Sequence, residues 1–112
     1  MSDMTTRLQT MLDAGQDNLL LRFTLGKAMV EQEQFDKAVV HLTAALAFDE
    51  RFSNAWKFLG RARLALGDAA GARQAWEQGS AVATERGDVQ VAREMAVFLK
   101  RLDKQDGVQS SR

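Results

Sequence analysis

The chain has 112 residues, with 15 basic and 15 acidic side chains and no cysteine. The zero net charge removes any bulk attraction to nucleic acid or anionic membranes, and the lack of cysteine excludes disulfides, thiolate metal sites and cysteine nucleophiles. No segment approaches the ~18 consecutive apolar residues of a membrane span, and the N-terminus lacks the basic start and apolar run of a signal peptide. We therefore expect a cytoplasmic protein.

Composition predicts an all-α fold. Proline and tyrosine are absent, and alanine, leucine, glutamine, arginine and glutamate, which are good helix formers, dominate. Asp17 or Asn18, then Ser53 and Asp68, stand where side chains cap helix starts. In chain order we expect six helices, over residues 3–14, 19–32, 35–48, 53–66, 69–84 and 88–104. The polar residues 105–112 are expected to form a flexible tail.

A repeat with a period of 34 residues runs through the chain. Leu25-Gly26 recurs as Leu59-Gly60, and Ala38 recurs as Ala72. Two further pairs keep the offset, Leu42 with Trp76 and Ala45 with Gly79. Internal repeats at such a period are the signature of helical repeat architectures, in which stacked helix pairs share one core.

These residues carry a resemblance to the tetratricopeptide repeat, a helix–turn–helix unit of the same length. Trp56, Leu59, Gly60, Ala72 and Trp76 match the positions of its pattern one by one. The first copy is looser, because it has an arginine at the large aromatic position, Glu-Gln in place of Gly-Asp at the turn, and no closing proline. The departing residues are Arg22, Glu33, Gln34 and Glu50, together with Arg63 and Thr84 in the second copy.

The resemblance implies a right-handed superhelical stack of antiparallel helix pairs. Met4, Leu8 and Met11 fit a half-repeat in helix 3–14, which precedes repeat 1 (19–52) and repeat 2 (53–86). With a two-residue slip in register, residues of helix 88–104 fall on core positions and close a single domain over 1–104. These residues are Ala92, Met95, Ala96 and Leu99.

The residues offer no catalytic constellation. His41 is the single histidine, and no acid lies on its helical face at the spacing that pairs side chains. The segment from Gly67 to Gly71 lacks the Lys-Ser/Thr of a phosphate-binding loop, and Trp56 and Trp76 occupy core positions of the repeat. We expect no enzyme activity, no metal and no cofactor.

In proteins with this repeat, first-helix side chains that face away from the core line a concave groove. At those positions the chain places basic residues beside an aromatic and an asparagine, and no acid. The residues are Phe23, Lys27, Asn54, Lys57, Arg61, Arg93 and Lys100. We therefore expect an adaptor or scaffold that binds a protein or peptide segment, possibly an acidic one, in this groove. The alternative interpretation is a solvated face whose charges serve solubility.

A second class of function stays open. A short stack has exposed ends, and their apolar residues could pair two copies, so that the chain would be a monomer or a weak homodimer. The residues concerned are Met4, Leu8, Val91, Phe98 and Leu102. Nucleic-acid binding is not expected, because the net charge is zero and no exposed aromatic interleaves with the basic residues.

Overall fold

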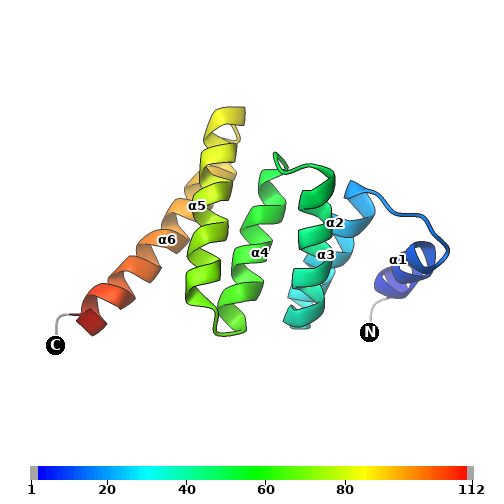
Figure 1. Cartoon of the computed structure of the whole chain (residues 1–112), viewed down its shortest axis with the longest axis horizontal. Coiled ribbons are helices and arrows are strands. Elements are labelled where there is room, and N and C mark those ends of the chain that lie inside the picture. The colour runs from blue at the N-terminus through cyan, green and yellow to red at the C-terminus, as the bar shows by residue number, and fades with distance from the viewer. Residues whose placement is uncertain (1–2, 111–112) are drawn as a thin grey trace.

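The computed structural model describes residues 3–110, with the side chains from Met4 to Gln105. These residues form six helices and no strand, which confirms the predicted all-α repeat fold (Figure 1). The helices are α1 (Asp3–Asp13), α2 (Leu19–Glu31), α3 (Phe35–Phe48), α4 (Ser53–Ala65), α5 (Ala69–Arg86) and α6 (Val89–Ser110).

Two of the predicted helix caps are confirmed. The side-chain oxygen of Asn18 accepts a hydrogen bond of 2.9 Å from the backbone N–H of Leu21, which satisfies an otherwise orphaned donor at the start of α2. In the second repeat, Asp68 accepts from the backbone N–H of Gly71 at 2.8 Å in the same way. Each repeat therefore has one helix whose start is fixed by its own sequence.

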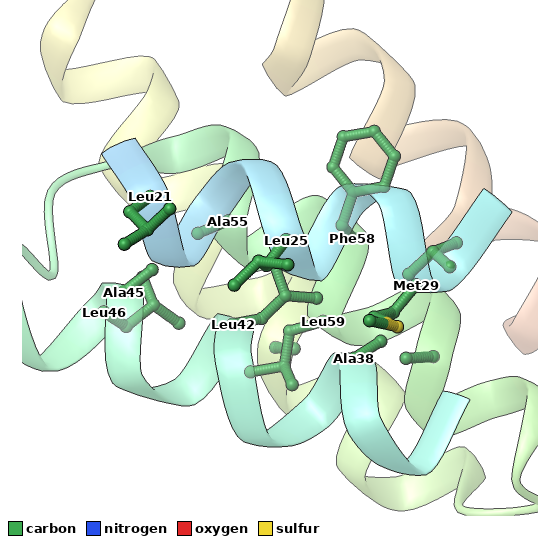
Figure 2. Packing of buried hydrophobic residues seen from close by; sticks show 13 residues of the cluster. Leu21, Leu25, Met29, Ala38, Leu42, Ala45, Leu46, Ala55, Phe58 and Leu59 are labelled. Atoms are coloured by element: carbon green, nitrogen blue, oxygen red, sulfur yellow. The ribbon is translucent and has the colours of Figure 1, made fainter. Parts of the chain in front are cut away.

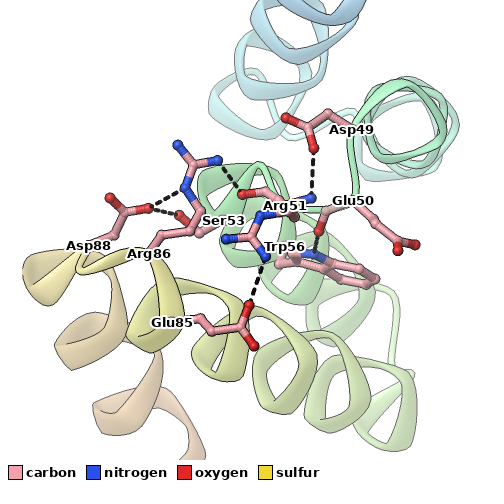
Figure 3. A network of polar contacts seen from close by, with 8 residues as sticks. All are labelled: Asp49, Glu50, Arg51, Ser53, Trp56, Glu85, Arg86 and Asp88. Atoms are coloured by element: carbon pink, nitrogen blue, oxygen red, sulfur yellow. Dashed lines mark hydrogen bonds and ion pairs between the residues drawn. The ribbon is translucent and has the colours of Figure 1, made fainter.

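The predicted cap at Ser53 is wrong, because Ser53 already lies inside α4 and its side chain bonds elsewhere. Its hydroxyl donates a hydrogen bond of 2.8 Å to Asp88, at the turn between α5 and α6. Arg51, in the loop before α4, forms an ion pair of 2.7 Å with Glu85 on α5, and its carbonyl accepts from Arg86 at 2.7 Å (Figure 3). These contacts join the loop entering the second repeat to the loop leaving it.

The C-terminal helices differ from the expected boundaries. α5 continues to Arg86 and ends at Gly87, whose φ of 79° is the left-handed conformation that glycine adopts without strain. α6 runs to Ser110, beyond the expected end at residue 104. Of the expected tail, residues 105–110 are therefore helical, and 111–112 lie outside the described residues.

The helices stack in chain order, with α1 at one end of the molecule and α6 at the other (Figure 1). Neighbouring helices from α2 to α6 pack as successive antiparallel partners. In addition α2 contacts α4 and α4 contacts α6, whereas among the described residues no such contact joins α3 to α5. The first helices of the repeats thus lie close together on an inner side, and the second helices spread apart on the outer side.

The core repeats the same small-against-large contact in both copies. A Cβ added at Gly26 would lie 2.5 Å from Cγ of Leu42, and one added at Gly60 would lie 2.2 Å from Nε1 of Trp76. Both large partners are buried, and Figure 2 shows Leu42 among the buried side chains of α2, α3 and α4. The glycines are therefore required by the close approach of helices.

The ends of the stack are better covered than the sequence predicted. Leu8 packs against the core of the first repeat, and Val91 and Phe98 pack against that of the second. Leu102 is only 4% exposed, whereas Met4 is 48% exposed. Of the apolar residues considered for pairing two copies, only Met4 is thus largely exposed, because α1 and α6 turn the others inward.

Candidate functional site

The inner side of the stack is organised around three phenylalanines. Phe23 of α2 meets Phe52, in the loop before α4, edge to face with ring centroids 4.8 Å apart. It meets Phe58 of α4 in a similar geometry at 5.9 Å. Edge-to-face pairs are favourable because the positive ring edge of one residue faces the negative ring face of the other. The aromatic contacts join the two first helices at their inner faces.

Three cations gather at the ring of Phe58. The Nζ atom of Lys57 lies 5.0 Å from the ring centroid, Cζ of Arg61 5.4 Å, and Nζ of Lys27 5.9 Å. Cation–π contacts of this kind contribute roughly 0.5–1 kcal/mol each at exposed positions. Phe58 itself is buried, with 7% of its surface exposed, so it acts as a fixed base for the charges. We call Phe23, Lys27, Lys57, Phe58 and Arg61 the basic–aromatic cluster.

Among the described side chains, Lys57 is the one cation of this cluster that has an acidic partner. Its Nζ atom lies 2.9 Å from a carboxylate oxygen of Glu94 on α6, and the lysine side chain is 14% exposed. The sequence predicted no acid at the inner positions, and Glu94 corrects that expectation. Lys27 and Arg61 are exposed and have no ion pair among the described side chains. They are therefore the cations of the cluster that a ligand could reach.

Helix α6 presents a different set of residues to the inner side from the one expected. Glu94 pairs with Lys57, and Phe98 and Arg101 line a hollow together with Arg61. Glu94 and Arg101 each lie one residue beyond the residues expected there, Arg93 and Lys100. A helix turns by about 100° per residue, so this difference moves the expected residues off the inner face.

Arg93 contributes instead to a separate hollow of about 370 Å³ between α5 and α6, next to Ala83 and Gly87. Lys100 follows Arg93 by seven residues, a spacing that places both on one side of the helix. The structure therefore does not bring Arg93 and Lys100 together with the basic–aromatic cluster. Asn54 is partly buried in the first turn of α4, one turn before Lys57.

Packing against Trp76 explains the rotation of α6. The ring of Phe98 lies 5.0 Å from that of Trp76, centroid to centroid, and Met95 and Leu102 are buried. Val91, Met95, Phe98 and Leu102 form a stripe of large apolar residues at helical spacing, whereas Ala96, expected in the core, is exposed. The larger residues win the buried face because they remove more apolar surface from water. This stripe was the signal in the sequence that could have located Glu94, Phe98 and Arg101.

A second polar group lies at the entry to the first repeat. Arg22, at the position of Trp56 in the other copy, binds Asp17 through Nε at 2.8 Å and donates to Nδ1 of His41 at 3.2 Å. Burial, and then the charge of Arg22, lower the pKa of His41 below its ordinary value. The hydrogen bond from Arg22 likewise lowers the pKa of Asp17.

His41 is therefore a neutral, hydrogen-bonded residue in a buried position, 7% exposed. Because arginine can only donate, Nδ1 accepts and the ring proton lies on Nε2. Among the described residues no group of three or more histidine, cysteine or acidic side chains could hold a metal ion. Within the same residues, no helix has the length and apolar character needed to cross a bilayer.

The fold and its inner face define a protein of the helical repeat class. The tetratricopeptide repeat model matches residues 29–96, which is more than half of the chain. The TPR repeat-containing protein PA0015 of Pseudomonas aeruginosa is 50% identical over 97 residues, covering 87% of this chain and 92% of that protein. The chain belongs to the tetratricopeptide repeat family.

Solved structures agree with this assignment. The solution structure of BPP2914 from Bordetella parapertussis has a TM-score of 0.87 and 54% sequence identity, and the match covers 100% of this chain and 97% of that one. The crystal structure of MamA has a TM-score of 0.64 at 15% identity, covering 96% of this chain and 70% of that one, and shares the fold. Repeats of this family generally mediate protein–protein interaction.

Proposed function

We propose that this protein binds an acidic segment of a partner protein along its inner face, at the basic–aromatic cluster. The observation that carries the proposal is the gathering of Lys27, Lys57 and Arg61 at the ring of Phe58. These like charges repel one another, and an anion that binds among them reduces that repulsion. A carboxylate-rich segment supplies that anion.

The two exposed cations would act differently. Arg61 presents a planar guanidinium that can hold a carboxylate through two parallel hydrogen bonds, whereas Lys27 contributes a mobile point charge. Phe23 is partly buried beside them and offers apolar surface to a ligand side chain. Affinity would then come from burial on the aromatic rings, and specificity and association rate from the charges.

Glu94 would tune this surface. Its ion pair with Lys57 holds the lysine in place and cancels part of the positive potential. Because Lys57 already forms an ion pair with Glu94, Lys27 and Arg61 are the cations available to an acidic residue of the ligand. Replacing Glu94 by glutamine should strengthen the binding of an acidic ligand by about threefold, because one opposing charge disappears.

The test is a titration with a fluorescein-labelled synthetic peptide rich in glutamate and carrying one phenylalanine, followed by fluorescence anisotropy. The double variant Lys27→Glu and Arg61→Glu should weaken binding by at least about tenfold, equivalent to about 1.4 kcal/mol. Circular dichroism checks that the variant keeps its helical content. Binding of the wild type should also weaken as salt is raised, since exposed charges are screened.

The matched control reverses two cations that lie off the inner face, Lys37→Glu and Arg93→Glu. It changes the net charge by the same amount and should leave binding unchanged. Equal losses in both double variants would mean that only the total charge matters, and the proposed site would be wrong. Equal binding of a peptide with glutamine in place of glutamate would also contradict it.

Self-association through the stack ends has less support. The alternative from the sequence rested on Met4, Leu8, Val91, Phe98 and Leu102, and all of these except Met4 pack against the cores of their own chain. The surface that would drive pairing is therefore largely used within one copy.

A further inference from the structure

A hollow of about 600 Å³ lies beside the basic–aromatic cluster, and the function proposed above assigns no role to it. It opens between the C-terminal ends of α2 and α4 and the middle of α6. Its lining is mainly apolar, with Val30, Phe35, Leu64, Ala65, Trp76, Phe98 and Leu102. Pockets of roughly 300–1,000 Å³ accommodate drug-sized molecules, so this one has room for a large apolar side chain.

Opposite charges flank this apolar surface. Arg61 and Arg101 reach it from α4 and α6, and Glu31 and Glu33 reach it from the end of α2 and the following turn. All four are exposed, and none forms an ion pair with another described side chain. The hollow therefore has a basic side, continuous with the cluster through Arg61, and an acidic side.

The acidic side includes a residue in a strained conformation. Glu33 has a φ of 60°, in the left-handed region that disfavours residues with a side chain. The equivalent residue of the second repeat is Gly67, with a φ of 86°. Strain that a glycine would relieve, at a residue lining a hollow, points to a use for the side chain.

We propose that the hollow selects which acidic segment binds, a proposal that rests on the function proposed above. The ligand places a large apolar side chain on Leu64 and Phe98. Its carboxylates lie toward Arg61 and Arg101, and a basic group on the other side of the apolar residue lies toward Glu31 and Glu33. The preferred segment thus carries basic, large apolar and acidic residues in sequence.

The probe is a fluorescein-labelled synthetic peptide in which one lysine, one phenylalanine and two glutamates follow one another at short spacing in a Gly-Ser background. Three relatives replace phenylalanine by serine, lysine by glutamine, or both glutamates by glutamine. Loss of phenylalanine or of the glutamates should weaken binding about tenfold or more, and loss of lysine about threefold.

Protein variants separate the hollow from the cluster. Leu64 is 40% exposed, so Leu64→Gln should keep the fold, and Ala65→Phe should fill the space. Both should weaken binding of the phenylalanine peptide about tenfold and leave the serine peptide unchanged. Leu66→Gln is the matched control, since Leu66 is 53% exposed on the same helix end and does not line the hollow.

Charge variants test the two sides. Glu31→Gln with Glu33→Gln should abolish the preference for the lysine peptide over its glutamine relative. Arg101→Gln should weaken binding of every glutamate-containing peptide about threefold, whereas Arg93→Gln, on another side of α6, should change nothing.

The outcomes distinguish the two proposals. If the wild type binds the serine and phenylalanine peptides equally well, the hollow is no selector, while the acidic ligand of the inner face stands. If the preference for lysine persists without Glu31 and Glu33, the bipolar ligand is excluded. If no glutamate-containing peptide binds at all, both proposals fail.

Discussion

The two repeats share their backbone but differ in the residues that stabilise it. The turn of the first repeat has hydrogen bonds from Glu33 and Gln34 to the carbonyls of Val30 and Met29, and Gly67 and Asp68 make the corresponding bonds in the second. Yet only the second turn has the glycine and the capping aspartate that suit this geometry. Packing between helices therefore fixes the turn, and local residue preference adjusts its stability.

The largest difference between the repeats should appear at the small residues of the helix crossings. Gly60→Ala forces a Cβ against the indole of Trp76, which is rigid and donates a hydrogen bond of 3.1 Å to the carbonyl of Lys57. We expect a loss of about 3 kcal/mol in the free energy of unfolding, at the upper end of overpacking effects. Gly26→Ala should cost about half of that, because Leu42 can change its rotamer. Urea denaturation measures both, and equal losses would show that the two crossings tolerate volume alike.

The repeats also differ at the start of their first helices, where Trp56 of the second repeat corresponds to Arg22 of the first. Trp56 packs against the cores of both repeats and donates a hydrogen bond of 2.8 Å to the carbonyl of Glu50 (Figure 3). Trp56→Ala should lower the free energy of unfolding by about 3 kcal/mol, as expected for a large aromatic that joins two clusters.

Arg22, the counterpart of Trp56, should matter less. Its ion pair with Asp17 is partly exposed, so Arg22→Ala should cost about 1 kcal/mol, mostly from leaving the buried His41 without its donor. Urea denaturation of the two alanine variants gives the comparison directly. If Arg22→Ala lowers the free energy of unfolding more than Trp56→Ala does, the start of the first repeat depends more on its polar group than the start of the second repeat depends on its aromatic residue.

Substitutions in the two turns should change the free energy of unfolding by smaller amounts and in opposite directions. Glu33→Gly relieves a left-handed φ of 60° and should raise the free energy of unfolding by about 0.5–1 kcal/mol. Gly67→Ala imposes a side chain on a φ of 86° and should lower it by about 1 kcal/mol. Thermal melts of both variants test this. If Glu33→Gly destabilises the protein, the side chain of Glu33 contributes more within the fold than its conformation costs.

The same comparison explains what could be predicted from the sequence. The fold could be predicted from the sequence. The pair Gly26 and Leu42 recurs 34 residues later as Gly60 and Trp76, and 34 residues is the length of a known repeat. The position of α6 on the inner side could only be predicted approximately. α5 is longer than α3 and the turn after it is shorter, so the spacing leaves a rotation of one residue undetermined. Phe98 on Trp76 decides that rotation, and with it the pairing of Lys57 with Glu94.

The smallest expected effect is a pH dependence confined to the first repeat. Arg22, Asp17 and Lys37 are the charged groups that act on His41, and its pKa is lowered mainly by burial. The unfolded chain therefore takes up a proton on His41 before the folded chain does. Stability is complete above the ordinary histidine pKa of about 6.5 and falls as the pH drops below that value.

The variant His41→Gln should remove this fall between neutral and mildly acidic pH, and urea denaturation at a series of pH values would show it. In the second repeat, Ala75 stands at the position of His41, so no counterpart titrates there. The lowered pKa of Asp17 affects the stability of the protein only at more acidic pH, where that carboxylate becomes protonated. An unchanged pH profile in His41→Gln would mean that other groups carry the dependence, and that the polar entry of the first repeat is insensitive to the charge on its histidine.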